Sequence, residues 1–180
     1  MRYRWLIIAS IILGGLFSLK AQESGSVNIN IPLHPVQILT VNPGQENVNI
    51  DFRNSNDYIQ GVASLSEGHL TVFSTGGYEI SVRAAVPGFE PTAGQENEIP
   101  LHLLRIEALM PGGSTGPKNL SSVHLRDYHQ NIISSSHADL GVSYDIIYEG
   151  LGGLALLEYV SDDLEVSTIT ARVTYSIEIK

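Results

Sequence analysis

The residue pattern in this 180-residue chain that most resembles a catalytic motif is a serine in a glycine-rich segment. Gly112-Gly113-Ser114-Thr115-Gly116 matches the G-x-S-x-G pattern of a nucleophilic serine. That pattern works because a sharp strand-to-helix turn exposes the serine at the top of an α/β sheet. Here Pro111 and Pro117 enclose the segment, and no α/β pattern surrounds it. We therefore expect a surface loop and not a catalytic site.

The histidines and acids lack the spacing of a metal site. The six histidines are scattered, and none forms an H-x-H, H-x-x-x-H or H-E-x-x-H pattern. His124 and His129 flank Asp127, which is a weak metal pattern, and exposed loop histidines are the simpler interpretation. Asp162-Asp163-Leu164-Glu165 lacks the regular ligand spacing of a calcium loop. We expect no catalytic residue, no metal and no cofactor, so the chain is predicted not to be an enzyme.

The first 21 residues have the pattern of a signal peptide. Arg2 and Arg4 precede an apolar run, Trp5–Phe17, which is shorter than the about 20 residues that span a membrane. A cut after Ala21 leaves 22–180 as one domain. The protein is therefore predicted to be exported to the periplasm, the cell surface or the extracellular space, with no membrane insertion after cleavage.

Charge and cysteine content limit the classes of partner and fold. Once residues 1–21 are removed, seven basic and 19 acidic residues remain, a net charge of −12. Such a surface repels phosphate backbones and anionic lipid headgroups, so nucleic acid and direct membrane binding are not expected. The absence of cysteine excludes a disulfide framework, so an apolar core must hold the fold together.

The two ends of the mature chain alternate between apolar and polar residues, as strands with one buried face do. At the C-terminus one phase is apolar and the other polar; the apolar residues are Ile169, Ala171, Val173, Tyr175, Ile177 and Ile179. At the N-terminus Val27, Ile29, Ile31 and Leu33 alternate with polar residues, and Gly25 shares their phase. Pro32 and Pro35 limit that strand to an edge or end it.

Between the two ends, short β-rich segments alternate with turn residues. Strands are predicted over 36–41, 48–52, 69–74, 78–85 and 142–148, with Thr75-Gly76-Gly77 as a hairpin loop. Ile99–Met110 slips phase, which a β-bulge or a short helix explains equally well. In Leu151–Val160 we expect one short helical turn at most. The pattern predicts an all-β fold, an antiparallel Ig-like (Greek-key) β-sandwich with at most one or two short helical turns.

The export signal, the alternating N-terminal arm at 22–35, the all-β body and the alternating final strand together resemble subunits of bacterial chaperone–usher pili and related cysteine-free, Ig-like secreted domains. The resemblance implies a fimbrial cell-adhesion protein whose N-terminal arm completes a neighbouring subunit. It implies that a periplasmic chaperone first holds the C-terminal strand. The donor-strand candidates are Gly25, Val27, Ile29 and Ile31, and the groove candidates are the six apolar residues of the last strand.

Two other interpretations stay open. The terminal strands can pair within one self-contained sandwich instead of between copies. Such a sandwich would be a secreted binding module for a glycan or a protein, with loops 88–97 and 111–119 as the contact regions. Tyr144 and Tyr148 share a strand phase with Ile146, which favours core positions over a sugar-stacking surface.

Overall fold

The computed structural model describes residues 24–89, 99–110, 118–160 and 166–180. It divides the chain into two units, Met1–Leu33 and His34–Lys180. The described part of the first unit, 24–33, contains no helix or strand. The predicted signal peptide, the G-x-S-x-G segment and the acidic run 162–165 lie outside the described residues.

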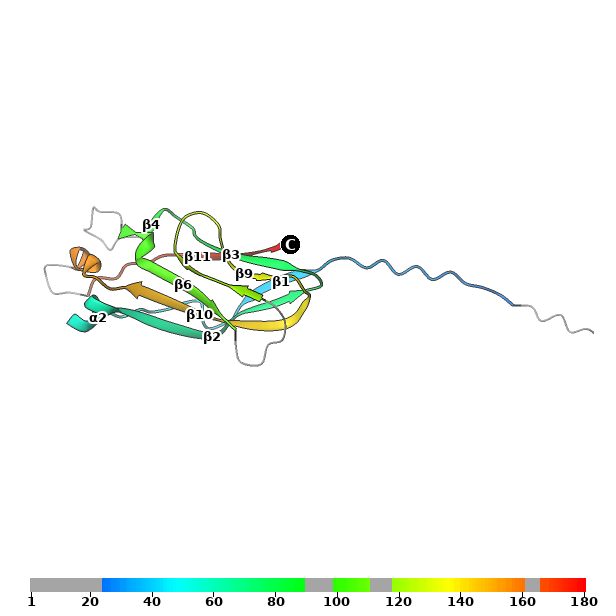
Figure 1. Ribbon diagram of the computed structural model, residues 1–180, viewed down its shortest axis with the longest axis horizontal. Coiled ribbons are helices and arrows are strands. Elements are labelled where there is room, and N and C mark those ends of the chain that lie inside the picture. Colours follow the sequence, from blue (N-terminus) through cyan, green and yellow to red (C-terminus); the bar gives the residue numbers. More distant parts are fainter. Residues whose placement is uncertain (1–23, 90–98, 111–117, 161–165) are drawn as a thin grey trace, which may run out of the picture. The chain divides into compact units, whose positions relative to one another are not determined.

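The described residues of the second unit form two antiparallel sheets and a short strand pair (Figure 1). The larger sheet has the order β1 (Gln37–Val41), β2 (Gly61–Ser74), β10 (Asp139–Leu151), β6 (Leu104–Leu109), β8 (Ser122–His124). The smaller sheet has the order β11 (Val173–Ile179), β3 (Tyr78–Ala84), β9 (Gln130–Ser135), β7 (Lys118–Leu120). The short pair is β4 (Gly88–Phe89) with β5 (Ile99–Pro100). The predicted all-β antiparallel sandwich is confirmed, and its Ig-like wiring stays a prediction.

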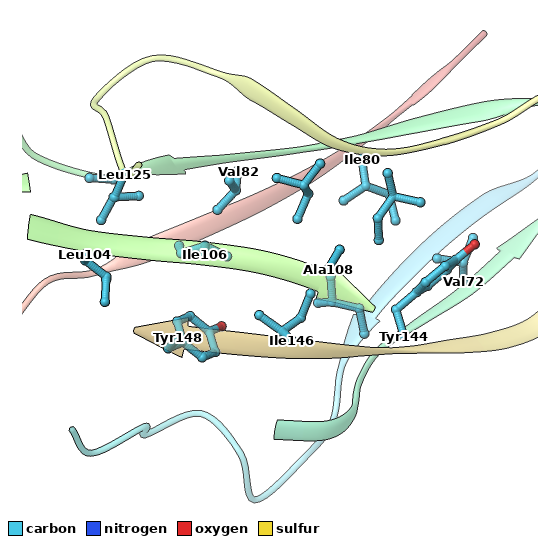
Figure 2. Packing of buried hydrophobic residues seen from close by; sticks show 14 of the residues in the cluster. Val72, Ile80, Val82, Leu104, Ile106, Ala108, Leu125, Tyr144, Ile146 and Tyr148 are labelled. Carbon is cyan, nitrogen blue, oxygen red and sulfur yellow. The ribbon is translucent and has the colours of Figure 1, made fainter. Parts of the chain in front are cut away.

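The core consists of the inward phases of both sheets. In β3 every second residue is buried, from Tyr78 to Ala84, and in β6 the same holds from Leu104 to Ala108. Val82 of β3, Ile106 of β6 and Ile146 of β10 belong to one apolar cluster (Figure 2). Each such side chain contributes about 1.5–3 kcal/mol by leaving water. Because the chain has no disulfide, this cluster is the main source of stability.

Bulges change which residues face the core. The pairing of β2 with β10 shifts between Tyr144 and Ile146, where Gly68 takes a positive φ of 59°. The extra residues let both His69 and Leu70 turn inward, although neighbours on a regular strand point to opposite faces. His69 is therefore buried.

In the part of the chain that the structure describes, three short helical segments interrupt the strands. A 3₁₀ turn at η2 (Leu101–Leu103) explains the phase slip of 99–110, and η3 (Ala155–Tyr159) supplies the single turn expected in 151–160. The helix α2 (Ser55–Gln60) was not expected from its sequence. Asn54 caps it by accepting hydrogen bonds from the backbone of Asn56 and Asp57, so the turn-forming residues at 54–57 begin a helix.

Two predicted elements are wrong. Thr75-Gly76-Gly77 is not a hairpin loop, because β2 and β3 belong to different sheets and the segment crosses between them. Local sequence shows that two strands are joined by a turn, but it does not show whether they pair. The predicted strand at 48–52 is irregular chain, although Val48 and Ile50 still pack against the core.

A close backbone approach between α2 and the end of β10 gives a first testable prediction. A Cβ atom on Gly152 would lie 2.4 Å from the carbonyl oxygen of Ile59 and 2.5 Å from the amide nitrogen of Gly61. Backbone atoms cannot move aside cheaply, so Gly152→Ala is expected to lower the free energy of unfolding by about 1–3 kcal/mol. Urea denaturation measures this change in the free energy of unfolding. Gly76→Ala is the matched control, because a Cβ atom on Gly76 would meet nothing within 4 Å. Equal stability of both variants would contradict the contact.

Candidate assembly site

The described part of the N-terminal arm, 24–33, carries a row of exposed apolar side chains. Val27, Ile29, Ile31 and Leu33 each leave between 74% and 89% of their surface exposed. Asn28, Asn30 and Pro32 separate them, so all four fall in one phase. Gly25 shares that phase, and a Cβ atom there would meet nothing within 4 Å. Exposed apolar residues at strand spacing are typical of a segment that becomes buried against a partner.

The other terminal segment, β11, forms one edge of the smaller sheet. It pairs in the ladder with β3, where Tyr175 lies opposite Val82 and Ile177 opposite Ile80. Val173, Tyr175 and Ile177 are half-buried against the core, although their partners on β3 are fully buried. An edge strand presents backbone donors and acceptors on its unpaired side. Among the described strands, β11 therefore has a neighbour on one side only, and its apolar row is incompletely covered.

The C-terminal strand is shorter in the structure than the sequence predicted. Ile169 and Ala171 precede β11, which begins at Val173, so the strand is shorter than the alternation of 169–179 indicated. Ile179 lies in β11 but leaves 68% of its surface exposed. The structure thus brings together Val173, Tyr175 and Ile177 on one inward row of β11, and Ala171 packs against the same core just before the strand begins.

β1, one of the two edge strands of the larger sheet, lies next to β11. Residues of β1 and β11 are neighbours across the two sheets, and Leu39 and Val41 of β1 are also half-buried against the core. Since β1 and β11 are both edge strands, the sandwich has partly exposed apolar side chains from both sheets on this side. An added strand on β11 would cover them, because its own inward side chains would reach the same layer.

A chain of buried polar groups holds β11 against the larger sheet. The hydroxyls of Tyr175 and Tyr148 lie 2.6 Å apart, Nε2 of His69 lies 2.8 Å from the Tyr148 hydroxyl, and Nδ1 of His69 lies 3.0 Å from Oε1 of Gln45. Burial raises the pKa of Tyr148 to about 12 and raises that of Tyr175 well above its ordinary value. Both tyrosines therefore stay neutral. The contact between their hydroxyls holds Tyr175 in its inward orientation. Sequence reasoning placed Tyr148 in the core correctly but missed its partners.

This network makes a pH-dependent prediction. Burial lowers the pKa of His69 below its ordinary 6.5, so the folded state favours the neutral ring. The stability linked to this group is fully present above pH 6.5 and is lost as the pH falls towards the lower folded pKa. The free energy of unfolding of His69→Gln is therefore expected to depend less on pH below about 6.5 than that of the wild type.

Urea denaturation at several pH values measures this dependence. His129→Gln, which changes an exposed histidine, is the control. Parallel pH curves for the wild type and His69→Gln would show that His69 titrates alike in the folded and unfolded chain.

A second buried polar cluster joins the two sheets at the start of β10. The Tyr78 hydroxyl donates to Oδ2 of Asp139 at 2.6 Å and lies 2.5 Å from the Tyr144 hydroxyl. Nζ of Lys118 lies 2.8 Å from the same Oδ2, and the two charged side chains are 2% and 9% exposed. Burial and the hydrogen bond to Asp139 raise the pKa of Tyr78 far above its ordinary value. Burial lowers the pKa of Lys118, but its hydrogen bonds to Asp139 and Tyr144 outweigh this and raise it overall.

The composition of this cluster indicates a structural role. Every one of its polar groups has a partner inside the protein, and Lys118 also lies 5.2 Å from the centre of the Tyr144 ring. Because each group has a partner on another strand, the cluster cross-links β3, β7 and β10 through hydrogen bonds. Nothing in the sequence pattern signalled it, since Lys118 and Asp139 follow turn-rich segments and resemble surface residues.

The described residues contain no group of three or more His, Cys, Asp or Glu side chains that could hold a metal ion. Within the same residues, no helix has the length and apolar character needed to cross a membrane. Most of the two loops proposed for a binding module, 88–97 and 111–119, lies outside the described residues.

Comparison with known proteins identifies no family for this chain. No protein-family model matches the chain, and no curated protein matches it.

Proposed function

We propose that this protein is a structural, non-enzymatic subunit of a bacterial cell-surface fibre, and that it assembles by strand complementation. In this proposal the N-terminal arm of one copy adds as a strand to the β11 edge of the next copy. The observation that carries it is the pairing of two incomplete features in one chain: an exposed apolar row on the arm and an edge strand with a half-buried apolar row.

The chemistry of the two rows is complementary. Val27, Ile29 and Ile31 have the two-residue spacing of Val173, Tyr175 and Ile177, so both sets can face the core at once. Backbone hydrogen bonds along β11 would supply affinity, and each Val or Ile that leaves water would add about 1.5–3 kcal/mol. Pro32 lacks an amide hydrogen and would end the added ladder near Leu33.

The exposed β11 edge also indicates which partners the protein needs besides the arm of another copy. An exposed edge with an apolar row aggregates if it is left uncovered during export. A periplasmic chaperone that covers β11 until the arm of another copy replaces it would prevent this. The mature chain would then be located on the cell surface, with like subunits as its lasting partners and no cofactor.

The first experiment measures the oligomeric state of the mature protein by light scattering, with and without residues 22–33. We expect polymers that resist SDS for the intact chain and none for the deletion variant. Adding a synthetic peptide of residues 22–33 is expected to raise the melting temperature of the deletion variant, because it fills the open edge. Monomers in both cases, with no effect of the peptide, would contradict assembly and favour a self-contained sandwich.

A further inference from the structure

A second apolar feature lies on the outer face of the larger sheet. Ile38 of β1 and Leu140 of β10 are both direct ladder partners of Phe73 in β2. The side chain of Ile38 is 52% exposed, that of Leu140 71% and that of Phe73 39%. They form one cross-strand row on three adjacent strands, which we call the outer row.

Local backbone geometry explains why the outer row points to solvent. Leu39 and Val72, the sequence neighbours of Ile38 and Phe73, face the core, so Ile38 and Phe73 face outward. In β10 the pairing shifts between Leu140 and Val142, with Gly141 at a φ of +84°. This bulge keeps Leu140 on the outer face while Asp139 remains buried.

The cross-strand row next to the outer row, on the same face of the sheet, is polar. Thr71 lies opposite Thr40 in β1 and opposite Ser143 in β10, and the hydroxyls of Thr71 and Ser143 are 3.0 Å apart. The outer row is therefore a bounded apolar patch and not an extension of the core. An apolar row of this kind is typical of a contact surface.

The covalent chain identifies what can cover the outer row. Ile38 follows Leu33, the last apolar residue of the arm, by five residues. Five residues span at most about 17 Å when fully extended. A copy that has bound the arm as far as Leu33 is therefore held within that distance of Ile38. The partner that strand complementation brings to this region is the copy that receives the arm.

We propose that the outer row is the docking face between successive copies in the fibre. It packs against the surface of the copy that has accepted the arm and fixes the angle between neighbouring domains. This inference rests on the proposed function, since it takes the arm to be bound by a second copy. The arm provides the connection, and the outer row provides the rigid contact.

The test uses the double variant Phe73→Thr/Leu140→Thr in the mature chain, because threonine keeps the preference for strand. Leu65→Thr is the matched control. Leu65 lies on the same strand as Phe73 and is 52% exposed, but it stands eight residues away. Circular dichroism and urea denaturation verify that each variant folds.

Two readouts separate the outer row from the arm. The first is the protein concentration at which half of the chains are polymeric, and we expect it to rise about tenfold for the double variant and to stay unchanged for Leu65→Thr. The second is the affinity of a labelled peptide of residues 22–33 for chains whose own arm carries Ile29→Asp. This affinity is expected to be equal with and without the two threonines.

Each other result overturns the inference. If polymerisation of the double variant is unchanged, strand complementation stands and the outer row is not a docking face. If the peptide affinity falls as much as polymerisation does, the outer row belongs to the binding site of the arm itself. If wild-type chains neither polymerise nor bind the peptide, both the proposed function and the docking face are wrong.

Discussion

Ile29→Asp in the mature protein is expected to abolish polymerisation, whereas Asn28→Asp is expected to leave it nearly unchanged. Ile29 is the middle residue of the apolar row of the arm and would face the core of the receiving copy. Burying an unpaired carboxylate there costs several kcal/mol, more than the gain from one added strand residue. Asn28 is in the opposite phase and would point to solvent, where a carboxylate is tolerated.

The pair of variants is matched because both add one negative charge at adjacent positions. Light scattering and SDS-resistant ladders measure the outcome. A similar loss of polymer in both variants would indicate a general charge effect, and polymer in both would show that the phase of the arm does not matter. Only a difference between positions 28 and 29 supports insertion of the arm as a strand.

The second large effect is on stability. Asp139→Ala is expected to lower the free energy of unfolding by about 3–5 kcal/mol, because it leaves the ammonium of Lys118 buried without its carboxylate. It also removes the acceptor of the Tyr78 hydroxyl. A mature domain of this size has a total stability of about 5–15 kcal/mol, so the variant loses a large part of it. Urea denaturation at neutral pH measures the change.

Two further variants test the cause. Lys118→Met/Asp139→Leu removes both charges and is expected to be more stable than Asp139→Ala, since an apolar replacement leaves no unpaired ion. Asp51→Ala breaks an exposed pair with Arg53, with the two side chains 58% and 78% exposed, and is expected to change stability by less than about 1 kcal/mol. If Asp139→Ala costs no more than Asp51→Ala, the cluster does not hold the sheets together.

The sequence predicted the elements whose pattern is local and regular. β3 and the predicted part of β10, 142–148, alternate between buried and less buried residues, and β11 has the predicted apolar phase from Val173 onward. β6 alternates as well, but it lies in the stretch 99–110, for which the pattern left a β-bulge and a short helix open. Strand alternation is visible because side chains point to opposite faces in turn, whatever their partners are. The class of fold followed from these segments and from the turns between them.

Pairing and irregular geometry were not predictable in the same way. The assignment of β2 and β3 to different sheets depends on contacts with β10 and β9, which are far away in the sequence. The bulge at Gly68 that buries His69 depends on the opposite strand, and so does the bulge at Gly141 that exposes Leu140. The Lys118–Asp139 pair joins residues that are well separated in sequence and lie on different sheets. The outer row likewise appears only once the register of three strands is known.

The most direct test of strand complementation is disulfide trapping between copies, which is clean because the natural chain contains no cysteine. Asn30→Cys in the arm and Ser176→Cys in β11 are made in separate mature chains and mixed under mild oxidation. Thr174→Cys covers the neighbouring register, and Tyr128→Cys, at an exposed position outside β11, is the control.

We expect a disulfide-linked dimer of the arm variant with a β11 variant and none with the control, because paired strands bring Cα atoms within about 4.4–6.8 Å. The double variant Asn30→Cys/Ser176→Cys is then expected to form covalent ladders. No cross-link between the mixed chains, together with a cross-linked monomer of the double variant, would place the arm on its own domain and contradict the fibre.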